Sequence, residues 1–116
     1  MSGRKSRSKG AEGEREAARE LTKLMKRDHI RAAQRNGKFG ADVIPHDPMD
    51  AYGVHWEVKR AETFNPHAAI DQAVTDAVAD NVPAVLHRKN GTVWLCVVRL
   101  SDLVDFAQRI YLGVMR

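Results

Sequence analysis

The sequence predicts one α/β domain, with elements in the order helix, three strands, helix, two strands, helix. Three segments repeat apolar residues at the spacing of a helix face, and the segments between them alternate or run apolar, as strands do. A length of 116 residues suits a single domain, and so small a core favours association with a second subunit. The predicted helices span residues 11–28, 67–80 and 102–112, and the predicted strands span residues 29–33, 41–45, 54–60, 83–88 and 92–100.

Residues 1–10 are predicted to form a flexible basic arm ahead of a single domain at residues 11–116. The arm holds four basic residues, Lys9 among them, and no acid, whereas the rest of the chain is balanced and the total net charge is +4. Serine and glycine in such a segment favour disorder, and its charge favours contact with a polyanion such as nucleic acid. A solubilising tail is the alternative interpretation.

The first predicted helix carries an acid on its apolar side. Four apolar residues recur at helical spacing and define the side that should face the core: Ala18, Leu21, Leu24 and Met25. Glu14 precedes Ala18 by four residues and therefore shares that side. A carboxylate in such a place needs a partner, because burying an unpaired charge is costly.

The central strands place charged residues among apolar ones. Asp42 lies within the second predicted strand. The third predicted strand alternates with period two, so that Glu57 and Lys59 project from one face while valine and tryptophan occupy the other. His55 shares the face of Glu57 and Lys59, so a contact with substrate is one interpretation, and a packed or solvated histidine is the favoured one.

Turn and cap residues frame the second half of the chain. Pro66 suits the start of the second helix, and the Asn90-Gly91 pair predicts a tight hairpin between the last two strands. Ser101 is predicted to cap the third helix. Cys96, the single cysteine, lies in an apolar run and is expected to be buried.

Several classes of protein are disfavoured by what the sequence lacks. No apolar run approaches the roughly 18 residues that span a bilayer, so a soluble cytoplasmic protein is expected, in the host cytoplasm if a virus encodes it. The five histidines are scattered and the single cysteine offers no second soft ligand, which argues against structural zinc. The absence of a glycine-rich phosphate loop argues against a nucleotide site of that kind.

Asp42, Glu57 and Lys59 together suggest metal-dependent hydrolysis of a phosphodiester. Two acids from adjoining strands form an anionic site that a cation would relieve, and Mg²⁺ prefers carboxylate and carbonyl oxygens. Asp42 and Glu57 are the predicted ligands, with the Val58 carbonyl as a third, and Mn²⁺ can substitute. Lys59 would contact the attacking water or the phosphate. Glu14 would complete the site directly or through a water molecule.

The same pattern has a structural alternative. Acids and lysines are common on strands, and salt-bridged surface groups would produce a Glu-X-Lys triplet without any catalysis. The positions favour the metal site, because Glu14, Asp42 and Glu57 all occupy settings that solvated charges avoid.

A family resemblance covers nearly the whole domain, from about Lys9 to Phe106. The stretch KGAEGERE at residues 9–16, the later GAD and WEVK, and the glutamine of IDQAV resemble an archaeal-type Holliday junction resolvase of the PD-(D/E)XK nuclease superfamily. The resemblance implies a restriction-endonuclease-like core, with a central mixed five-stranded sheet flanked by helices. It also implies a magnesium-dependent endonuclease that acts as a homodimer and makes paired symmetric nicks in four-way junction DNA.

Carried over residue by residue, the resemblance gives catalytic roles to Glu14, Asp42, Glu57 and Lys59, with Asp42 and Glu57 as metal-binding acids. The chain departs from the family in the loop before Asp42, which lacks the usual serine, and at Ala41, where relatives carry a proline. A role for that serine therefore has no counterpart here.

The resemblance also indicates DNA contacts. Arg15 matches the arginine that follows the first glutamate, Arg31 or Arg35 matches a second DNA-contacting arginine, and Gln72 matches a glutamine on the helix after the Glu-X-Lys strand. Lys38 belongs with Arg31 and Arg35 to a basic segment that could follow DNA phosphates, and a solvated basic surface is the alternative.

The leading hypothesis is therefore a homodimeric, magnesium-dependent resolvase of four-way junctions. One alternative keeps the nuclease and changes the substrate to flaps, nicks or duplex DNA in repair or restriction. The other is a basic DNA-binding module without catalysis, whose acids form salt bridges with neighbouring cations.

Overall fold

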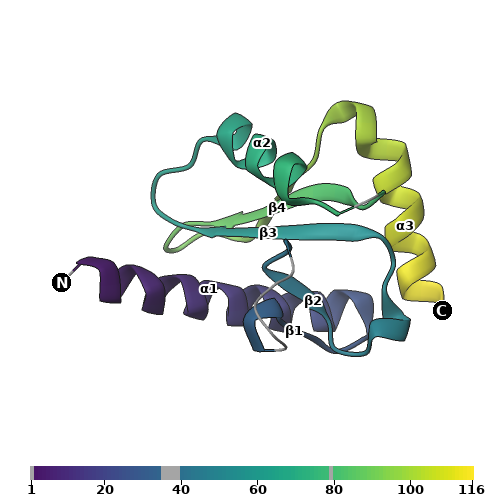
Figure 1. Cartoon of the computed structure of the whole chain (residues 1–116), viewed down its shortest axis with the longest axis horizontal. Helices are drawn as coiled ribbons and strands as arrows, with labels where there is room; N and C mark the ends of the chain where they lie inside the picture. The colour runs from purple at the N-terminus through teal and green to yellow at the C-terminus, as the bar shows by residue number, and fades with distance from the viewer. Residues whose placement is uncertain (1, 35–39, 79) are drawn as a thin grey trace.

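The computed structural model describes residues 2–34, 40–78 and 80–116, with side chains for residues 10–33 and for the two later ranges. Within this part a five-stranded mixed sheet is flanked by three helices in the predicted order αβββαββα, which is consistent with a restriction-endonuclease-like core (Figure 1). The predicted α/β class is confirmed. The helices are α1 (Ser2–Met25), α2 (Pro66–Asp76) and α3 (Leu103–Met115), the strands are β1 (His29–Arg31), β2 (Val43–Pro45), β3 (Val54–Arg60), β4 (Val82–Arg88) and β5 (Leu95–Val97), and three short 3₁₀ turns are η1 (Ala32–Gln34), η2 (Pro48–Asp50) and η3 (Leu100–Asp102).

The strands follow chain order across the sheet, from β1 at one edge to β5 at the other. The central strands β3 and β4 are parallel and are joined through α2, whereas the remaining neighbours are antiparallel. The predicted hairpin joins β4 to β5, and Gly91 takes a φ of 75°, a left-handed value that favours glycine in such turns.

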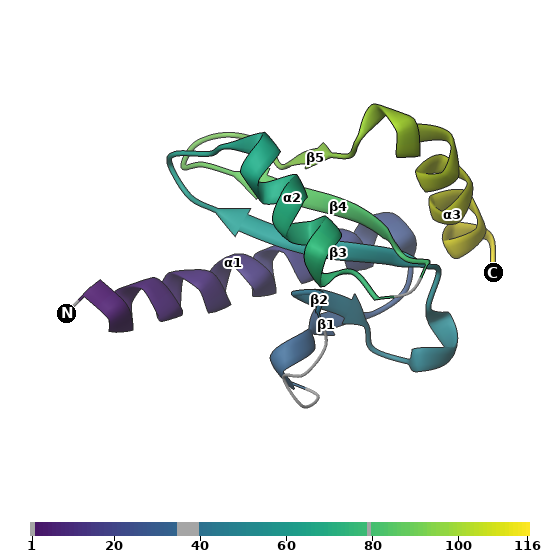
Figure 2. The same cartoon turned by 45° about the horizontal axis from the view of Figure 1, so that its top comes forward.

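Helices α1 and α2 cover opposite faces of the sheet (Figure 2). On one face, Trp56 and Val43 pack against buried residues of α1, and α3 adds Phe106 and Ile110 to the same cluster. On the other face, small and aliphatic residues of α2 pack against Val85. Because side chains alternate along β3, the residues on either side of Trp56 face α2.

The predicted apolar side of α1 is confirmed for three of its four members and is wrong for Leu24. Ala18, Leu21 and Met25 are buried, whereas Leu24 is 69% exposed. Each residue advances about 100° around a helix, so Leu24 lies about 120° from Ala18 and falls outside the side that meets the sheet. Three-residue spacing alone did not distinguish it from its neighbours.

Two expectations about the C-terminal segments are wrong. Ser101 does not cap α3, because it lies inside η3 and the residue before the helix is Asp102. Cys96 is exposed, not buried. It lies on the edge strand β5, which has a single neighbour and is therefore less covered than the central strands.

Helix α1 begins at Ser2, within the segment predicted as a flexible arm, and continues into the domain. The division into an arm at residues 1–10 and a domain at residues 11–116 therefore stays a prediction. Among the described residues, no helix combines the length and the apolar character that crossing a membrane requires.

Candidate active site

Asp42 lies where β2 stops pairing with β3. Val43 is opposite Trp56, and the Asp42 N–H donates to the Trp56 carbonyl at 2.8 Å. Two residues further along β3, the Val58 N–H donates to Oδ2 of the Asp42 carboxylate at 2.8 Å. A side-chain carboxylate thus takes the place of a backbone acceptor of the sheet, which fixes the direction of the Asp42 side chain.

Glu57 lies in the middle of β3 and is nearly inaccessible, with 3% of its surface exposed. One carboxylate oxygen, Oε1, is 3.0 Å from Nε2 of His55. The other, Oε2, is 4.0 Å from Nζ of Lys59. The three side chains alternate with core residues along one strand, so period-two geometry is enough to align them.

Lys59 is held from the opposite layer. Its Nζ donates to Oε1 of Gln72 at 2.8 Å, which connects the middle of α2 to the end of β3. The resemblance had suggested Gln72 as a DNA contact, and the structure places it against the lysine. Lys59 therefore keeps its ammonium group near Glu57 while a third of its side chain stays exposed.

Burial and the neighbouring charges change the pKa of Asp42. Burial raises the pKa of Asp42 to about 7, with the Val58 N–H opposing that change. The negative charges of Glu57 and Glu14 raise it further, and the positive charge of Lys59 lowers it. Burial and two neighbouring carboxylates therefore make Asp42 costly to ionise, and a cation at this position would remove the cost.

Glu14 comes to this region from α1 and is paired with an arginine. Its Oε1 accepts from Nε of Arg31 at 2.9 Å, and both side chains are largely covered. In residues 10–33, 40–78 and 80–116, no three His, Cys, Asp or Glu side chains are gathered so that they could hold a metal ion. The structure thus brings Asp42, Glu57 and Lys59 together, and it holds Glu14 against Arg31 without forming a three-acid ligand set.

The groups around Asp42 suit a hard divalent cation. Asp42 and Glu57 offer carboxylate oxygens. The carbonyl of Val58 faces the same side as its N–H, because both backbone groups of a strand residue point to the same neighbour. Mg²⁺ is commonly bound by one or two carboxylates and keeps several waters, so a third acid is not required. The residues present therefore fit such an ion.

The predicted DNA-contacting residues are spread more widely. Arg15 is exposed on α1 and pairs with Glu12 at 2.7 Å. Arg15 and Arg31 line a shallow hollow of about 160 Å³ with Arg19, which was not among the predicted DNA contacts. Its signal was a spacing of four from Arg15, which places both on one side of the helix. Arg35 and Lys38, and the side chain of Lys9, lie outside the described part of the chain.

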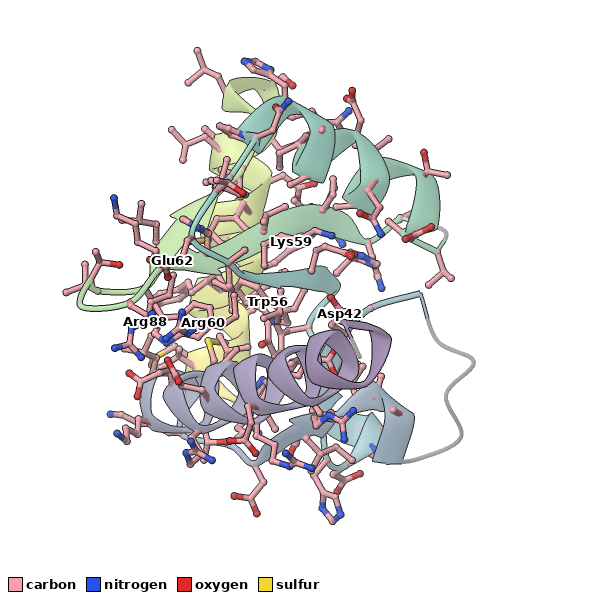
Figure 3. The ribbon with its side chains drawn as sticks, turned by 90° about the vertical axis from the view of Figure 1, so that its left-hand side faces the viewer. Asp42, Trp56, Lys59, Arg60, Glu62 and Arg88 are labelled. Atoms are coloured by element: carbon pink, nitrogen blue, oxygen red, sulfur yellow. The ribbon has the colours of Figure 1, made fainter. Side chains whose placement is uncertain are left out.

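A second polar cluster lies away from Asp42 and Lys59. Figure 3 shows Arg60, Arg88 and Glu62 together on one side of the molecule and Asp42 and Lys59 on the other. Arg60 follows Lys59 directly but faces α1, where Glu16 accepts from Arg88 and from Nε1 of Trp94. Glu16 of α1 forms ion pairs with Arg60 of β3 and Arg88 of β4, so this cluster joins α1 to the sheet.

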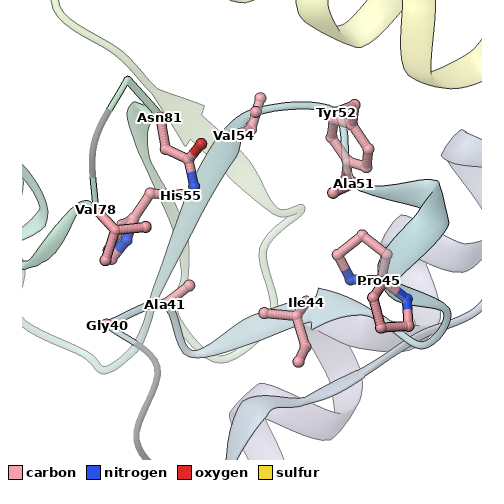
Figure 4. Close-up of a pocket in the computed structure, with 12 residues that line it drawn as sticks. Gly40, Ala41, Ile44, Pro45, Ala51, Tyr52, Val54, His55, Val78 and Asn81 are labelled. Carbon is pink, nitrogen blue, oxygen red and sulfur yellow. The ribbon is translucent and has the colours of Figure 1, made fainter.

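A cavity of about 220 Å³ borders the buried histidine of the site (Figure 4). Its lining is mainly apolar and includes Ala41, Ile44 and Val78, with the imidazole of His55 forming part of the wall. His55 thus touches this cavity and Glu57 at once. His55 was not among the predicted site residues, although its position two residues before Glu57 was a signal for contact.

The comparisons with known proteins place the chain in a family. A model of the phage putative PDDEXK endonuclease family matches residues 5–115. The chain has no significant match among curated proteins or solved structures. The match supports the superfamily expected from the sequence, and it carries no statement about archaeal resolvases.

Proposed function

This chain belongs to the phage putative PDDEXK endonuclease family, and from that membership and its site we propose that it is a magnesium-dependent endonuclease that resolves four-way DNA junctions by paired nicks. The observation that carries the proposal is the meeting of Asp42 with the Glu57-X-Lys59 strand. The Asp42 carboxylate accepts from the Val58 N–H, between Glu57 and Lys59, so β3 binds Asp42 through its backbone and carries the second acid and the lysine on either side of that bond.

Asp42, Glu57 and the Val58 carbonyl would hold the metal ion. Nucleases of this superfamily typically use divalent metals, and an all-oxygen donor set favours Mg²⁺, with Mn²⁺ as a substitute. When bound, such an ion supplies neutralisation of charge at the phosphate and a more acidic water. Two properties of this chain support the proposal: the Asp42 carboxylate is bonded to the strand that carries Glu57, and burial, with the charges of Glu57 and Glu14 adding to it, raises the pKa of Asp42, a cost that a cation would relieve.

Lys59 would orient the attacking water or the scissile phosphate. Its ammonium group is fixed by Gln72 and approaches Glu57, so it can donate to an oxygen brought beside that carboxylate. Glu14 would assist through a bound water. Arg31, which already pairs with Glu14, would face an incoming phosphate from the same position.

The remaining DNA contacts are proposed along the outer side of α1 and the segment after β1. Arg15 is exposed beside Arg31. Lys9, Arg35 and Lys38 are proposed as further contacts to DNA phosphates. Contacts to phosphates carry little sequence information, so the protein would recognise the shape of the junction.

Paired nicking would require a second copy of the chain, because one domain supplies one site. Helix α3 presents an apolar face to solvent, on the side away from Phe106 and Ile110. We name it the α3 apolar face, and its exposed members are Val104, Tyr111, Leu112 and Met115. Exposed apolar patches of this kind are typical of subunit contacts, which supports the proposal of a homodimer.

A nuclease for flaps, nicks or duplex DNA is the second candidate. The description of the matched family names an endonuclease and no particular DNA structure, so it favours this alternative as much as junction resolution. The same residues would serve the same chemistry, and only the shape of the bound DNA would differ.

The test is cleavage of a mobile four-way junction, end-labelled on each strand in turn and compared with flap, nicked and linear duplex DNA. We expect symmetric pairs of cuts with Mg²⁺ and none with Ca²⁺. Equal rates on junction and duplex, without paired cuts, would support the second candidate. The absence of product from every substrate would contradict a nuclease altogether.

Asp42→Asn separates binding from cleavage in the same assay. The amide oxygen of asparagine can still accept from the Val58 N–H, so the sheet should survive while one ligand charge is lost. We expect cleavage to fall by at least about 10²-fold, with junction binding retained. Glu20→Gln, which removes an exposed acid of α1 paired with Lys23, is the matched control and should cleave normally. Normal cleavage by Asp42→Asn would show that the site is misassigned.

A further inference from the structure

We propose that His55 is a positioning residue, whose imidazole fixes the carboxylate of Glu57 so that Oε2 is free for the metal ion. The inference rests on the proposed function, because it takes Glu57 as a metal-binding acid. It adds a residue that neither the Glu-X-Lys pattern nor the family match assigns.

The first observation is the contact itself. Nε2 of His55 lies 3.0 Å from Oε1 of Glu57, and both side chains are almost fully buried, with 1% and 3% of their surfaces exposed. An ionised carboxylate can only accept, so Nε2 carries the proton and donates it to Oε1. With Oε1 engaged, Oε2 is the oxygen on the side of Lys59, 4.0 Å from its Nζ.

The second observation is that the imidazole is held in place by packing. A Cβ on Gly40 would lie only 2.1 Å from the carbonyl oxygen of Asp76 and 3.5 Å from Cε1 of His55, so the chain at Gly40 packs closely against the end of α2 and lies beside the ring. The ring also forms part of the wall of the apolar cavity shown in Figure 4. Most of that wall is apolar, with Ile44 and Val78 among its residues, and Asn81 adds a side-chain amide.

The third observation is the position of Glu57 in the sheet. Its side chain is buried against α2, and His55 is the donor found for Oε1 among the described residues. A carboxylate that must bind a cation gains from a fixed orientation, because the ligand is then already in place when the ion arrives. Partners that orient a ligand in this way typically change metal affinity by about 10–100-fold when they are removed.

A purely structural role makes a different prediction. If His55 only fills the core, its replacement should lower stability and leave the affinity of the folded protein for metal unchanged. If it positions Glu57, the affinity should fall whenever the donor at Nε2 is lost, whatever the stability does.

The experiment measures binding of Mn²⁺ to the full chain without DNA, from the loss of the free-ion signal in electron paramagnetic resonance. We expect His55→Phe to weaken Mn²⁺ binding by about 10–100-fold. His55→Gln, whose amide nitrogen reaches the place of Nε2, should stay within about threefold of wild type. The Mn²⁺ concentration for half-maximal cleavage should shift in parallel.

His87→Phe is the matched control. His87 is a buried histidine of the neighbouring strand β4 whose Nε2 bonds the Ala61 carbonyl and whose ring stacks on Phe64. Phenylalanine keeps the stacking and loses the hydrogen bond, as at His55, but no carboxylate is involved. Mn²⁺ affinity should therefore be unchanged.

Wild-type affinity in His55→Phe overturns the inference. If thermal unfolding shows that His55→Phe is not folded, the Mn²⁺ affinity of His55→Gln is compared with that of His55→Asn, whose shorter amide cannot reach Oε1. Equal affinities in these two variants overturn the inference as well. If the wild-type protein binds Mn²⁺ and cleaves DNA and the His55 variants do so equally well, the inference is wrong and the proposed function stands. A wild-type protein that binds no Mn²⁺ contradicts the proposed function itself.

Discussion

At the scale of single residues, His29, Tyr52 and Trp56 form a chain of hydrogen bonds in the core, in which each donor and each acceptor can be assigned. The Arg27 carbonyl can only accept, so Nδ1 of His29 donates to it at 2.8 Å and Nε2 is the unprotonated nitrogen. Nε2 then accepts from the Tyr52 hydroxyl at 2.7 Å, and the Tyr52 oxygen accepts from Nε1 of Trp56 at 2.8 Å. A second proton on His29 would turn Nε2 into a donor and take away the acceptor of the Tyr52 hydroxyl proton.

The first prediction concerns the pH dependence of stability. Burial lowers the pKa of His29, opposed by its bond to the Arg27 carbonyl and by the charges of Asp28 and Asp50. Below the ordinary value of 6.5 the unfolded chain therefore binds a proton that the folded chain does not, and stability falls as the pH falls below about 6.5. Denaturant unfolding from pH 8 to pH 5 should show a smaller loss in His29→Gln than in wild type. The same loss in both would contradict the assignment.

The acids and the lysine of the candidate site were predictable one by one, because strand alternation and an apolar setting suffice to single them out. Their partners were not. The contact of Arg31 with Glu14 and the contact of Gln72 with Lys59 depend on how a helix and a strand pack, and no spacing in the sequence contains that distance. His55 was in reach of the pattern, but its burial depends on the closeness of Gly40 to the end of α2.

At the scale of elements, the approach of α1 to β3 depends on one glycine. A Cβ on Gly13 would lie 2.4 Å from Cβ of Arg60, so the helix can lie this close to the strand only without a side chain there. Glu14 follows directly, and the close approach brings it to the sheet. The helix contact and the position of the acid are thus one feature.

The second prediction compares two glycines of α1. Gly13→Ala should lower the free energy of unfolding by about 1–3 kcal/mol, because the helix must shift to make room. It should also weaken cleavage, since Glu14 moves with the helix. Gly10→Ala is the control: nothing lies within 4 Å of its Cβ position, so alanine should stabilise the helix by about 0.5–1 kcal/mol. Urea unfolding of the pair decides, and equal effects would refute the close packing.

The order of elements followed from periodicity and turn residues, and the third strand, at residues 54–60, was correct to the residue. The wrong predictions of burial concern an edge strand that has no second neighbouring strand and a helix with apolar residues on more than one side. Leu24 looked like a core residue by spacing, and Cys96 looked like one by its apolar run, yet both face outward. Sequence patterns describe the shape of a segment, and they do not say whether another segment covers it.

For the whole molecule, the third prediction is that the α3 apolar face joins two copies. Val104 is 70% exposed on this face, and a lysine there would leave an unpaired charge in a subunit contact. Val104→Lys should raise the dissociation constant of the dimer by roughly tenfold or more, as measured by analytical ultracentrifugation, and should convert paired nicks into single ones.

Leu24→Lys provides the control for that substitution. Leu24 is similarly exposed, at 69%, but lies on α1 and is not a member of this face, so the variant should remain dimeric. A wild-type protein that sediments as a monomer, or a Val104→Lys protein that dimerises normally, would contradict the proposed interface.

Because Oδ2 of Asp42 substitutes for a main-chain acceptor, the requirements of the fold and of the chemistry converge on one atom. Alanine at this position would leave a strand amide without a partner, so selection for foldability alone can retain an aspartate or asparagine after activity has been lost. Degenerate relatives would then still resemble working nucleases at this column, and the glutamate and lysine of the next strand would be the better guide to which of them remain active.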